Sequence, residues 1–435
     1  MARSKYTKNN QAPEMQQQQT NHPMNEKQKE AFDAFFRRES MLITGSAGTG
    51  KSFVLMKIHQ AAAKQGLKVG ITGTTGSAAH LIGGRTIHSF LGVGLAKLTA
   101  QQLAYHTMTK NKALVKKLNS LDVLVIEEIS MMDAEFFEKV SDYLTIIRKS
   151  GKPFGGIQLV MLGDFCQLPP VNKNGNISFC FKSPIWEQLN LTTVRLTELV
   201  RQVDDPEFQR ILEEVRWGRC SEETMRTIRS WVKRPQQQDG SSSTIRPTRL
   251  FPKNVDVDTI NEHEYDLLTE DDNVQRRSYE TKYGSQPAKS WAKSCKIPEQ
   301  VRMCIGAQVV VTWNLNQASG IVNGTRGVVV ALNGTNVTIK DVKGRLLPID
   351  FVTLTDNNMS VTYMPLRLAY ALTIHRCQGM TLDSVIIDLG PSIFETGQGY
   401  TALSRVRNSE SLTLVAVEAS SFRCHPDVLA FYGEA

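Results

Sequence analysis

The first half of the chain alternates short apolar runs with longer segments of helical spacing. Four apolar runs lie between about residues 25 and 220, at 41–43, 69–71, 123–126 and 159–162. Strands that are apolar at nearly every position are typical of a parallel sheet covered by helices on both faces. The pattern therefore predicts one α/β domain in this half.

The second half follows a different pattern. A polar stretch without periodicity, residues 234–247, comes first. Between about 301 and 355, alternating strands are separated by Asn333-Gly334 and Lys343-Gly344, which are typical of hairpin turns. Strands at 385–387 and 412–417 return to α/β character. We predict a small antiparallel β module inserted within a second α/β domain.

The amino-terminal residues 1–22 are basic and glutamine-rich with almost no apolar content, which predicts a disordered arm. A chain of 435 residues is long enough for about three domains. No apolar stretch approaches the roughly 18 residues that a membrane span needs, so we expect no membrane partner.

Charge and cysteine content limit the classes of binding partner and the cellular compartments that we expect. The net charge of +8 suits a polyanion such as nucleic acid, although a basic surface kept for solubility explains it equally well. The seven cysteines are scattered without a CxxC pair, which argues against a disulfide framework or zinc ribbon and indicates a reducing compartment. We expect an intracellular protein, in the nucleus or mitochondrion of a eukaryote, the host nucleus or cytoplasm for a virus, or the bacterial cytoplasm.

A glycine-rich segment stands between the first apolar run and a helical segment. Gly45-Ser46-Ala47-Gly48-Thr49-Gly50-Lys51-Ser52 fits G-x-x-x-x-G-K-[ST] at every fixed position. Its glycines would let backbone N–H groups and the helix N-terminus point at phosphate oxygens, with Lys51 on the β- and γ-phosphates and the Ser52 hydroxyl on Mg²⁺. The pattern predicts a site for ATP and Mg²⁺, and a glycine-rich turn without a ligand is the alternative.

Polar side chains follow the next two strands. Glu127 and Glu128 come directly after the run at 123–126, and Gln167 follows the run at 159–162. Glu127 is placed to hold Mg²⁺ and Glu128 to orient and deprotonate the attacking water. The Gln167 amide suits a sensor between the γ-phosphate and other sites. A surface acidic pair is the alternative for the two glutamates.

Two arginines are candidates for stabilising the transferred phosphoryl group. Hydrolysis concentrates negative charge on that group, and a guanidinium from a second body commonly stabilises it. Arg201 follows Leu196-Thr197-Glu198-Leu199-Val200, and Arg405 ends Gly399-Tyr400-Thr401-Ala402-Leu403-Ser404. A solvated surface arginine is the alternative for each when it is considered alone.

Further segments occur with these in a fixed order. They are Thr74-Thr75-Gly76-Ser77-Ala78-Ala79, Gly83-Gly84-Arg85-Thr86-Ile87-His88-Ser89-Phe90, Glu128-Ile129-Ser130-Met131, Lys152-Pro153-Phe154-Gly155-Gly156-Ile157-Gln158, Gly320-Ile321-Val322-Asn323-Gly324 and Ile374-His375-Arg376-Cys377-Gln378-Gly379-Met380-Thr381-Leu382-Asp383. This set, across about residues 24 to 433, resembles the petite integration frequency (Pif) family of DNA helicases in class B of helicase superfamily one.

The resemblance implies two RecA-like domains that hold ATP between them, with single-stranded DNA across their top, 5′-to-3′ movement and duplex unwinding. It places the first domain at 23–195 with a wedge insertion at 91–120, the second at 196–261 and 366–435, and an SH3-like module at 262–365. Gln28 matches the family's adenine-reading glutamine, Arg201 and Arg405 the arginines of the second domain, and Gln378 with Gly379 a link to the nucleotide. The family normally has Asp-Glu where this chain has Glu127-Glu128, so the metal-side carboxylate is one methylene longer.

The family comparison also assigns two DNA-binding segments. Hydroxyls and loop amides can bind backbone phosphates, and an aromatic ring can stack on a base. The residues assigned to the strand are Thr74, Ser77, His88, Ser89 and Phe90 in the first domain and Thr373, His375 and Arg376 in the second. Phe90 considered alone is more typical of a core residue. The lysines of 91–120 fit either a duplex-splitting wedge or a solvated helix face.

We expect a DNA helicase acting on single-stranded, forked or overhang DNA, and replication or repair proteins stay open as further partners. A DNA-stimulated ATPase that translocates without separating strands is the rival within enzymes. A non-catalytic scaffold that binds ATP as a structural ligand is the alternative from another class.

Overall fold

The first domain is a six-stranded parallel sheet. The computed structural model describes residues 23–434 except 76–77, 80–83, 95, 171–176, 201, 203, 235–244, 295–296, 314, 317–318, 320 and 357–358. The strand order is β3-β2-β4-β5-β1-β6, and every pairing is parallel. The strands are β1 (Met41–Gly45), β2 (Val69–Gly73), β3 (Arg85–Thr86), β4 (Val123–Glu127), β5 (Gln158–Gly163) and β6 (Thr192–Leu196).

All residues of β1, β4 and β5 are buried, which explains their uninterrupted apolar sequence and confirms the predicted strands. Two separate apolar clusters cover the two faces of the sheet. The helices of this domain are α1 (Glu26–Phe36), α2 (Lys51–Lys64), α4 (Ile87–Leu91), α5 (Ala100–Lys110), α6 (Lys112–Asn119), α7 (Ala134–Arg148) and α8 (Pro184–Gln188).

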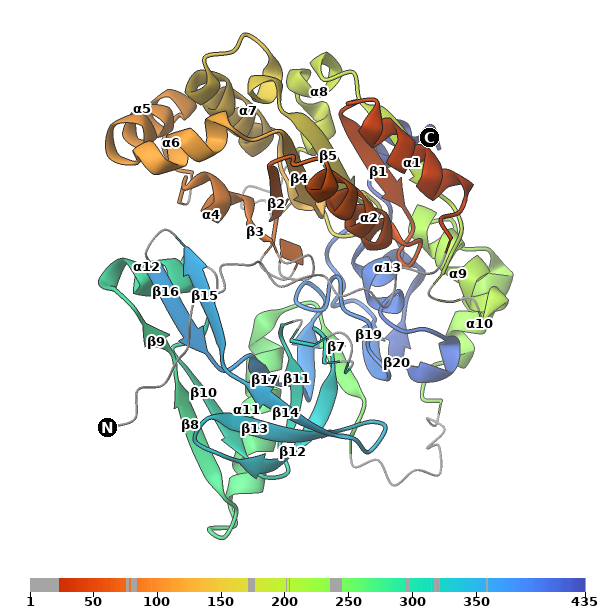
Figure 1. Ribbon diagram of the computed structural model, residues 1–435. Coiled ribbons are helices and arrows are strands. Elements are labelled where there is room, and N and C mark those ends of the chain that lie inside the picture. The colour runs from red at the N-terminus through yellow and green to blue at the C-terminus, as the bar shows by residue number, and fades with distance from the viewer. Residues whose placement is uncertain are drawn as a thin grey trace, which may run out of the picture.

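A second parallel sheet lies on the other side of the molecule in Figure 1, with strand order β18-β7-β19-β20. Its strands are β7 (Thr248–Phe251), β18 (Ala371–Thr373), β19 (Val385–Leu389) and β20 (Leu412–Val417). The helices of this part are α9 (Pro206–Trp217), α10 (Glu222–Ser230), α11 (Asn254–Thr269), α13 (Gln398–Leu403) and α14 (Pro426–Tyr432). The predicted return to α/β character is confirmed.

Between β7 and β18 the chain forms antiparallel sheets. The largest has the order β14-β13-β12-β11-β17, and the others are β10-β8 and β15-β16-β9. Both predicted hairpin turns join neighbouring strands of the largest sheet. The elements are β8 (Arg276–Glu280), β9 (Lys282–Tyr283), α12 (Gln286–Ser294), β10 (Gln300–Cys304), β11 (Gln308–Val311), β12 (Arg326–Leu332), β13 (Asn336–Asp341), β14 (Leu346–Asp350), β15 (Val352–Asp356), β16 (Met359–Tyr363) and β17 (Leu366–Leu368).

The exact domain limits stay predictions. The expected start of the module at 262 falls inside α11, whose side chain Asn261 hydrogen-bonds β18 through Ala371. A helix that is bonded to the second sheet runs into the module without a break, so composition alone does not mark this limit.

The carboxy-terminal helix α14 packs on the first domain. The Tyr432 hydroxyl lies 2.6 Å from the Thr44 hydroxyl of β1 and accepts from the Phe165 amide at 3.4 Å. The Phe431 ring stacks on Phe181 with centroids 4.4 Å apart. The chain therefore crosses from the second sheet back to the first at its end. No helix within the described part is long and apolar enough to cross a bilayer.

Candidate nucleotide cleft and adjoining track

The glycine-rich loop joins β1 to α2 at the carboxyl edge of the first sheet. Gly45 and Gly50 have positive φ angles, 146° and 86°, which L side chains rarely adopt. A Cβ at Gly45 would also collide with the Leu196 carbonyl oxygen of β6. Gly50 is the N-cap of α2 and supplies no side-chain cap, so the first amides of the helix are open to an anion.

Lys51 lies in the first turn of α2 and its amine folds back onto the loop. Nζ donates to the Gly45 and Ser46 carbonyls at 2.8 and 3.0 Å. Burial lowers the pKa of Lys51, while Asp164 and Glu128 act in the opposite direction. Phosphate oxygens could replace these two carbonyls as acceptors, which is the predicted role of this lysine.

Glu127, the last residue of β4, faces Ser52 from α2. The Ser52 hydroxyl donates to Glu127 Oε1 at 3.3 Å, and among the described residues Oε2 is buried without a hydrogen-bond partner. Burial, followed by the charge of Glu128, raises the pKa of Glu127 to about 7. A hydroxyl beside an unpartnered carboxylate oxygen fits a hard divalent cation such as Mg²⁺. The two predicted metal ligands are thus brought together.

Glu128 is joined to the second domain. Its backbone is left-handed, with φ 54° and ψ 46°, a conformation that costs energy and is concentrated at functional sites. Gln378 Nε2 donates to Glu128 Oε2 at 3.2 Å. Burial raises the pKa of Glu128, and the charges of Lys51 and Arg405 oppose that shift. The predicted base and the predicted link residue therefore touch.

One hollow collects these groups, and we call it the nucleotide cleft. It is lined by Ala47, Gly48, Gly50, Lys51, Ser52, Phe53, Ala78, Glu127, Glu128, Gln167, Val200, Gly379, Thr381, Arg405 and Arg407. The predicted sensor Gln167 and the predicted Gly379 lie here as expected. Thr381 and Arg407 were missed by the sequence reasoning, although Arg407 stands only two residues after Arg405.

Arg405 reaches the nucleotide cleft but is held by its own domain. Its side chain is 2% exposed, and Nε donates to the Thr401 carbonyl at 2.7 Å. Its other nitrogens donate to the Ser404 hydroxyl and to the carbonyls of Cys377 and Met380. Arg407, in contrast, is exposed in the same cleft. The other predicted arginine, Arg201, lies outside the described residues.

Gln28 sits against the outer side of the loop. It belongs to the first turn of α1, where it forms a capping box with Asn25. Its Nε2 donates to the Thr49 carbonyl at 3.3 Å, and the side chain is buried. This position beside the phosphate loop is compatible with the predicted reading of adenine.

A buried network ties the loop to the second domain. The Tyr400 hydroxyl of α13 accepts from the Ala47 amide at 2.9 Å and donates to Asp164 at 3.2 Å. Arg216 of α9 forms an ion pair with Asp164 at 3.0 Å, with both side chains almost fully buried. Burial acts to raise the pKa of Asp164, but Arg216 and Lys51 hold it below its usual value. Sequence reasoning missed these residues because their partners are far apart in the chain.

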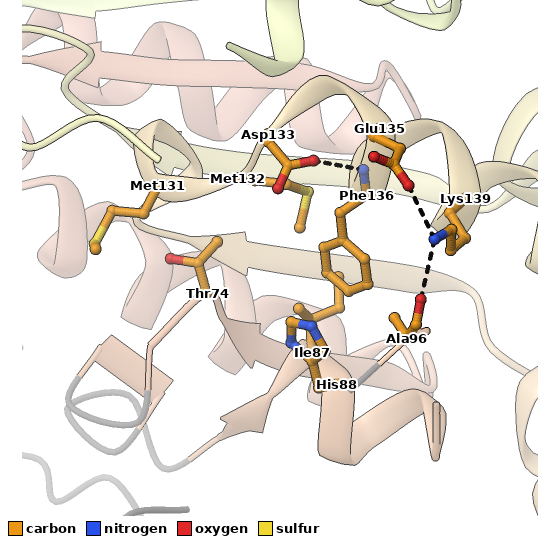
Figure 2. A pocket seen from close by; sticks show the side chains of 10 residues that line it. All are labelled: Thr74, Ile87, His88, Ala96, Met131, Met132, Asp133, Glu135, Phe136 and Lys139. Atoms are coloured by element: carbon orange, nitrogen blue, oxygen red, sulfur yellow. Dashed lines mark hydrogen bonds and ion pairs between the residues drawn. The ribbon is translucent and has the colours of Figure 1, made fainter. Parts of the chain in front are cut away.

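A second hollow adjoins the nucleotide cleft, and we call it the track pocket (Figure 2). It is lined by Thr74, Ile87, His88, Ala96, Met131, Met132, Asp133, Glu135, Phe136 and Lys139. The His88 ring of α4 is stacked on the Phe136 ring of α7, with centroids 4.1 Å apart. The Thr74 hydroxyl donates to the Glu128 carbonyl at 2.8 Å. Thr74 therefore connects the track pocket to the catalytic candidate.

Phe90, one of the two rings that could offer a face to a base, is the one that the structure buries. Its side chain is 6% exposed, and the Lys117 amine lies over the ring at 3.9 Å from the centroid. His88, the other ring assigned to the strand, is partly exposed and is therefore better placed than Phe90 to stack on a base. Its neighbour Ser89 accepts from Trp291 Nε1 at 3.1 Å. The predicted Ser77 lies outside the described residues.

The second-domain track residues stand at the end of β18. Thr373 is buried, and its hydroxyl accepts from the Arg376 amide at 3.2 Å. Arg376 forms an ion pair with Asp258 of α11 at 3.6 Å, and both it and His375 are partly exposed. His375 and Arg376 thus keep part of their surface in contact with solvent, whereas the Thr373 side chain serves the local turn.

The chain has relatives and structural neighbours along nearly all of its length. A family model for PIF1-like helicases matches residues 23–226, and one for the 2B domain of the DNA helicase Pif1 matches 292–332. The ATP-dependent DNA helicase PIF1 of Xenopus laevis is 36% identical, over 90% of this chain and 61% of that protein. The ATP-dependent DNA helicase Pif1 of Bdellovibrio bacteriovorus is 33% identical, over 93% of this chain and 90% of that protein.

Two solved structures agree with this. The Pif1 helicase of Candida albicans has a TM-score of 0.80 at 30% identity, covering 95% of this chain and 99% of the other. The Bacteroides Pif1 helicase in complex with ADP-AlF3 and single-stranded DNA has a TM-score of 0.68 at 26% identity, covering 95% and 97%. The predicted fold class of two RecA-like domains is confirmed by these likenesses. The chain spans about three fifths of the length of the Xenopus relative.

Proposed function

The chain belongs to the PIF1-like helicase family, and from this premise we propose that it is an ATP-dependent DNA helicase. We propose that it moves 5′-to-3′ on single-stranded DNA and unwinds forked or overhang duplexes. The observation that carries the proposal is the single cleft in which the phosphate loop, Glu127 and Glu128 face Arg405 of the second domain, with Gln378 of that domain bonded to Glu128.

The chemistry proposed for the nucleotide cleft uses residues of both domains. Lys51 exchanges its two loop carbonyls for phosphate oxygens, and Glu128, oriented by Gln378, accepts a proton from the attacking water. Arg405 supplies positive charge from the second domain. Ser52 and Glu127 would hold Mg²⁺, which when bound neutralises charge on the phosphate oxygens.

Motion follows from the two-domain character of the cleft. ATP bridges groups of both domains, so its binding free energy closes the cleft, and hydrolysis removes that bridge. The Thr74–Glu128 hydrogen bond gives a direct path by which a strand in the track pocket changes the position of the catalytic carboxylate. Contacts made mainly to phosphates imply little sequence preference and an affinity that falls steeply with salt.

A strand-displacement assay with a 5′ overhang tests the proposal. The expected result is ATP-dependent release of the complementary strand, accelerated phosphate release on addition of single-stranded DNA, and no product from a 3′ overhang. Phosphate release stimulated by DNA but without any displaced strand would instead support a translocase that does not separate strands. Nucleotide binding without hydrolysis would support the alternative of a non-catalytic scaffold that binds ATP as a structural ligand.

A further inference from the structure

Two cysteines from distant parts of the sequence meet beside the nucleotide cleft. The sulfurs of Cys166 and Cys424 are 4.0 Å apart. Cys166 lies in the turn after β5 that also carries Gln167, and Cys424 lies just before α14. A decrease of about 2 Å in this distance would bring the two sulfurs to the length of a disulfide bond. Neither residue has a role in the chemistry described above.

The two thiols differ in exposure and in acidity. Cys166 is buried and Cys424 is partly exposed. Contact with Cys166 lowers the pKa of Cys424, whereas burial raises the pKa of Cys166. Because the thiolate is the reactive form, an oxidant from solvent would meet Cys424 first, with Cys166 directly behind it. A partly exposed thiol that reacts first, with a buried thiol next to it, is an arrangement that suits a reversible disulfide.

The position of the pair would allow a disulfide to affect the geometry of the nucleotide cleft. The carbonyls of Cys166 and Gln167 press so closely on Gly397 that a Cβ there would collide with both. Gly397 is the N-cap of α13, and its amide donates to the carbonyl of Arg423, the neighbour of Cys424, at 2.9 Å. The helix α13 leads directly to Arg405. Cys166 therefore contacts the start of this helix through its own carbonyl, and Cys424 follows the residue that hydrogen-bonds it.

We propose that Cys166 and Cys424 form a reversible disulfide in response to a peroxide, and that this bond holds the nucleotide cleft in one state and suppresses turnover. The part about turnover rests on the proposed ATPase function, whereas formation of the bond does not. A protein in a reducing compartment would form such a bond transiently, as redox-sensing disulfides do.

Hydrogen peroxide can accept the two electrons that the thiols lose when the disulfide forms. The Cys424 thiolate attacks one peroxide oxygen, the O–O bond breaks, and the departing hydroxide takes up a proton to become water. The Cys166 thiol then loses its proton and attacks the sulfur of the Cys424 sulfenic acid, whose oxygen leaves as a second water. The two sulfurs together lose two electrons and the peroxide gains them. A dithiol reductant reverses the bond by exchange.

Formation of the bond is tested on the full reduced chain treated with hydrogen peroxide. We expect the intact mass to fall by about 2 Da and a crosslinked peptide pair containing Cys166 and Cys424, both reversed by dithiothreitol. Cys424→Ser and Cys166→Ala should each abolish the crosslink. Cys220→Ser is the matched control, because Cys220 is also partly exposed but burial raises its pKa to about 11. Absence of the crosslink, or overoxidation of Cys424 without it, would overturn the proposal.

Turnover is measured on the same samples with single-stranded DNA. We expect the oxidised chain to lose roughly tenfold in ATP hydrolysis, the loss to be restored by dithiothreitol, and Cys424→Ser to resist the oxidant. A crosslinked chain with unchanged turnover would refute the effect on the cleft. A reduced chain without any DNA-stimulated hydrolysis would instead refute the proposed function, while the mass measurement would still decide whether the disulfide forms.

Discussion

The hydrogen bond from the Thr74 hydroxyl to the Glu128 carbonyl joins the track pocket to the nucleotide cleft. The side chains that line these two hollows nevertheless have different surroundings. In the cleft, Glu127 is buried and Lys51 and Glu128 are partly exposed, but the three charged groups lie close together and burial shifts the pKa of each. In the track pocket, His88 and Thr74 remain partly exposed. Charge that is removed from water acts strongly on a transition state, whereas a strand that must slide needs contacts that exchange easily. Loss of a cleft residue should therefore cost far more than loss of a track residue.

The largest effect is expected for Lys51→Ala. The substitution removes the cation expected at the phosphates, takes the positive charge of Lys51 away from Glu127, and leaves Glu128 with the charge of Arg405 alone. We expect ATP hydrolysis to fall by at least about 10³-fold. Phosphate release measures this, and an unchanged far-UV circular dichroism spectrum controls for folding. Hydrolysis at a near-normal rate would show that the loop does not carry the reaction.

The second largest effect is expected for Arg405→Ala, and Arg407→Ala is its matched control in the same cleft. Loss of Arg405 should lower turnover by about 10³-fold while nucleotide binding persists. It should also lower the free energy of unfolding by about 3 kcal/mol, because the carbonyls and hydroxyl that the guanidinium satisfies are buried. Loss of the exposed Arg407 should leave the unfolding free energy unchanged. Equal unfolding midpoints for the two variants would contradict the buried geometry of Arg405.

Glu127→Asp tests the longer carboxylate at the metal side. Shortening the side chain by one methylene draws it away from Ser52, which it contacts at only 3.3 Å. We expect hydrolysis to fall by about tenfold at low Mg²⁺ and to recover partly at high Mg²⁺. A Mg²⁺ titration of phosphate release checks this. Faster hydrolysis at every Mg²⁺ concentration would mean that the site has not adapted to glutamate.

Thr74→Val probes the hydrogen bond that joins the two sites. Removal of the hydroxyl should reduce DNA stimulation of hydrolysis by about tenfold while basal hydrolysis stays near normal. Thr74→Ser keeps the donor and should restore stimulation. If the valine variant is stimulated as strongly as the parent, the signal between the sites takes another route.

The smallest effect is expected for His88→Ala. Loss of a ring in the track pocket should weaken binding to single-stranded DNA by about fivefold and leave basal hydrolysis unchanged. Fluorescence anisotropy at several salt concentrations measures the affinity. Because a stacking contact releases no counterions, the slope with salt should not change. A tenfold loss of basal hydrolysis would place His88 in the cleft chemistry instead.

Much of the candidate site could be predicted from the sequence because its parts are local. The strand–loop–helix order placed Lys51 and Ser52, and the apolar run before Glu127 placed both glutamates at the end of a buried strand. Carboxyl ends of parallel strands meet at one edge of a sheet, so Gln167 could be expected beside them. The assignment of Phe90 to the DNA strand was less secure than the assignment of these cleft residues, since a motif does not say which face of a ring is covered.

The sequence by itself determined the main strands of the first sheet, the phosphate loop and the place of Glu127 and Glu128 in the cleft, because backbone freedom and apolar periodicity act over a few positions. Only the tertiary structure decided that Tyr400 bonds the Ala47 amide, that α14 returns to the first domain, and that Cys166 meets Cys424. These contacts join residues more than two hundred positions apart. Their geometry depends on how the two domains pack against each other, which no local pattern encodes.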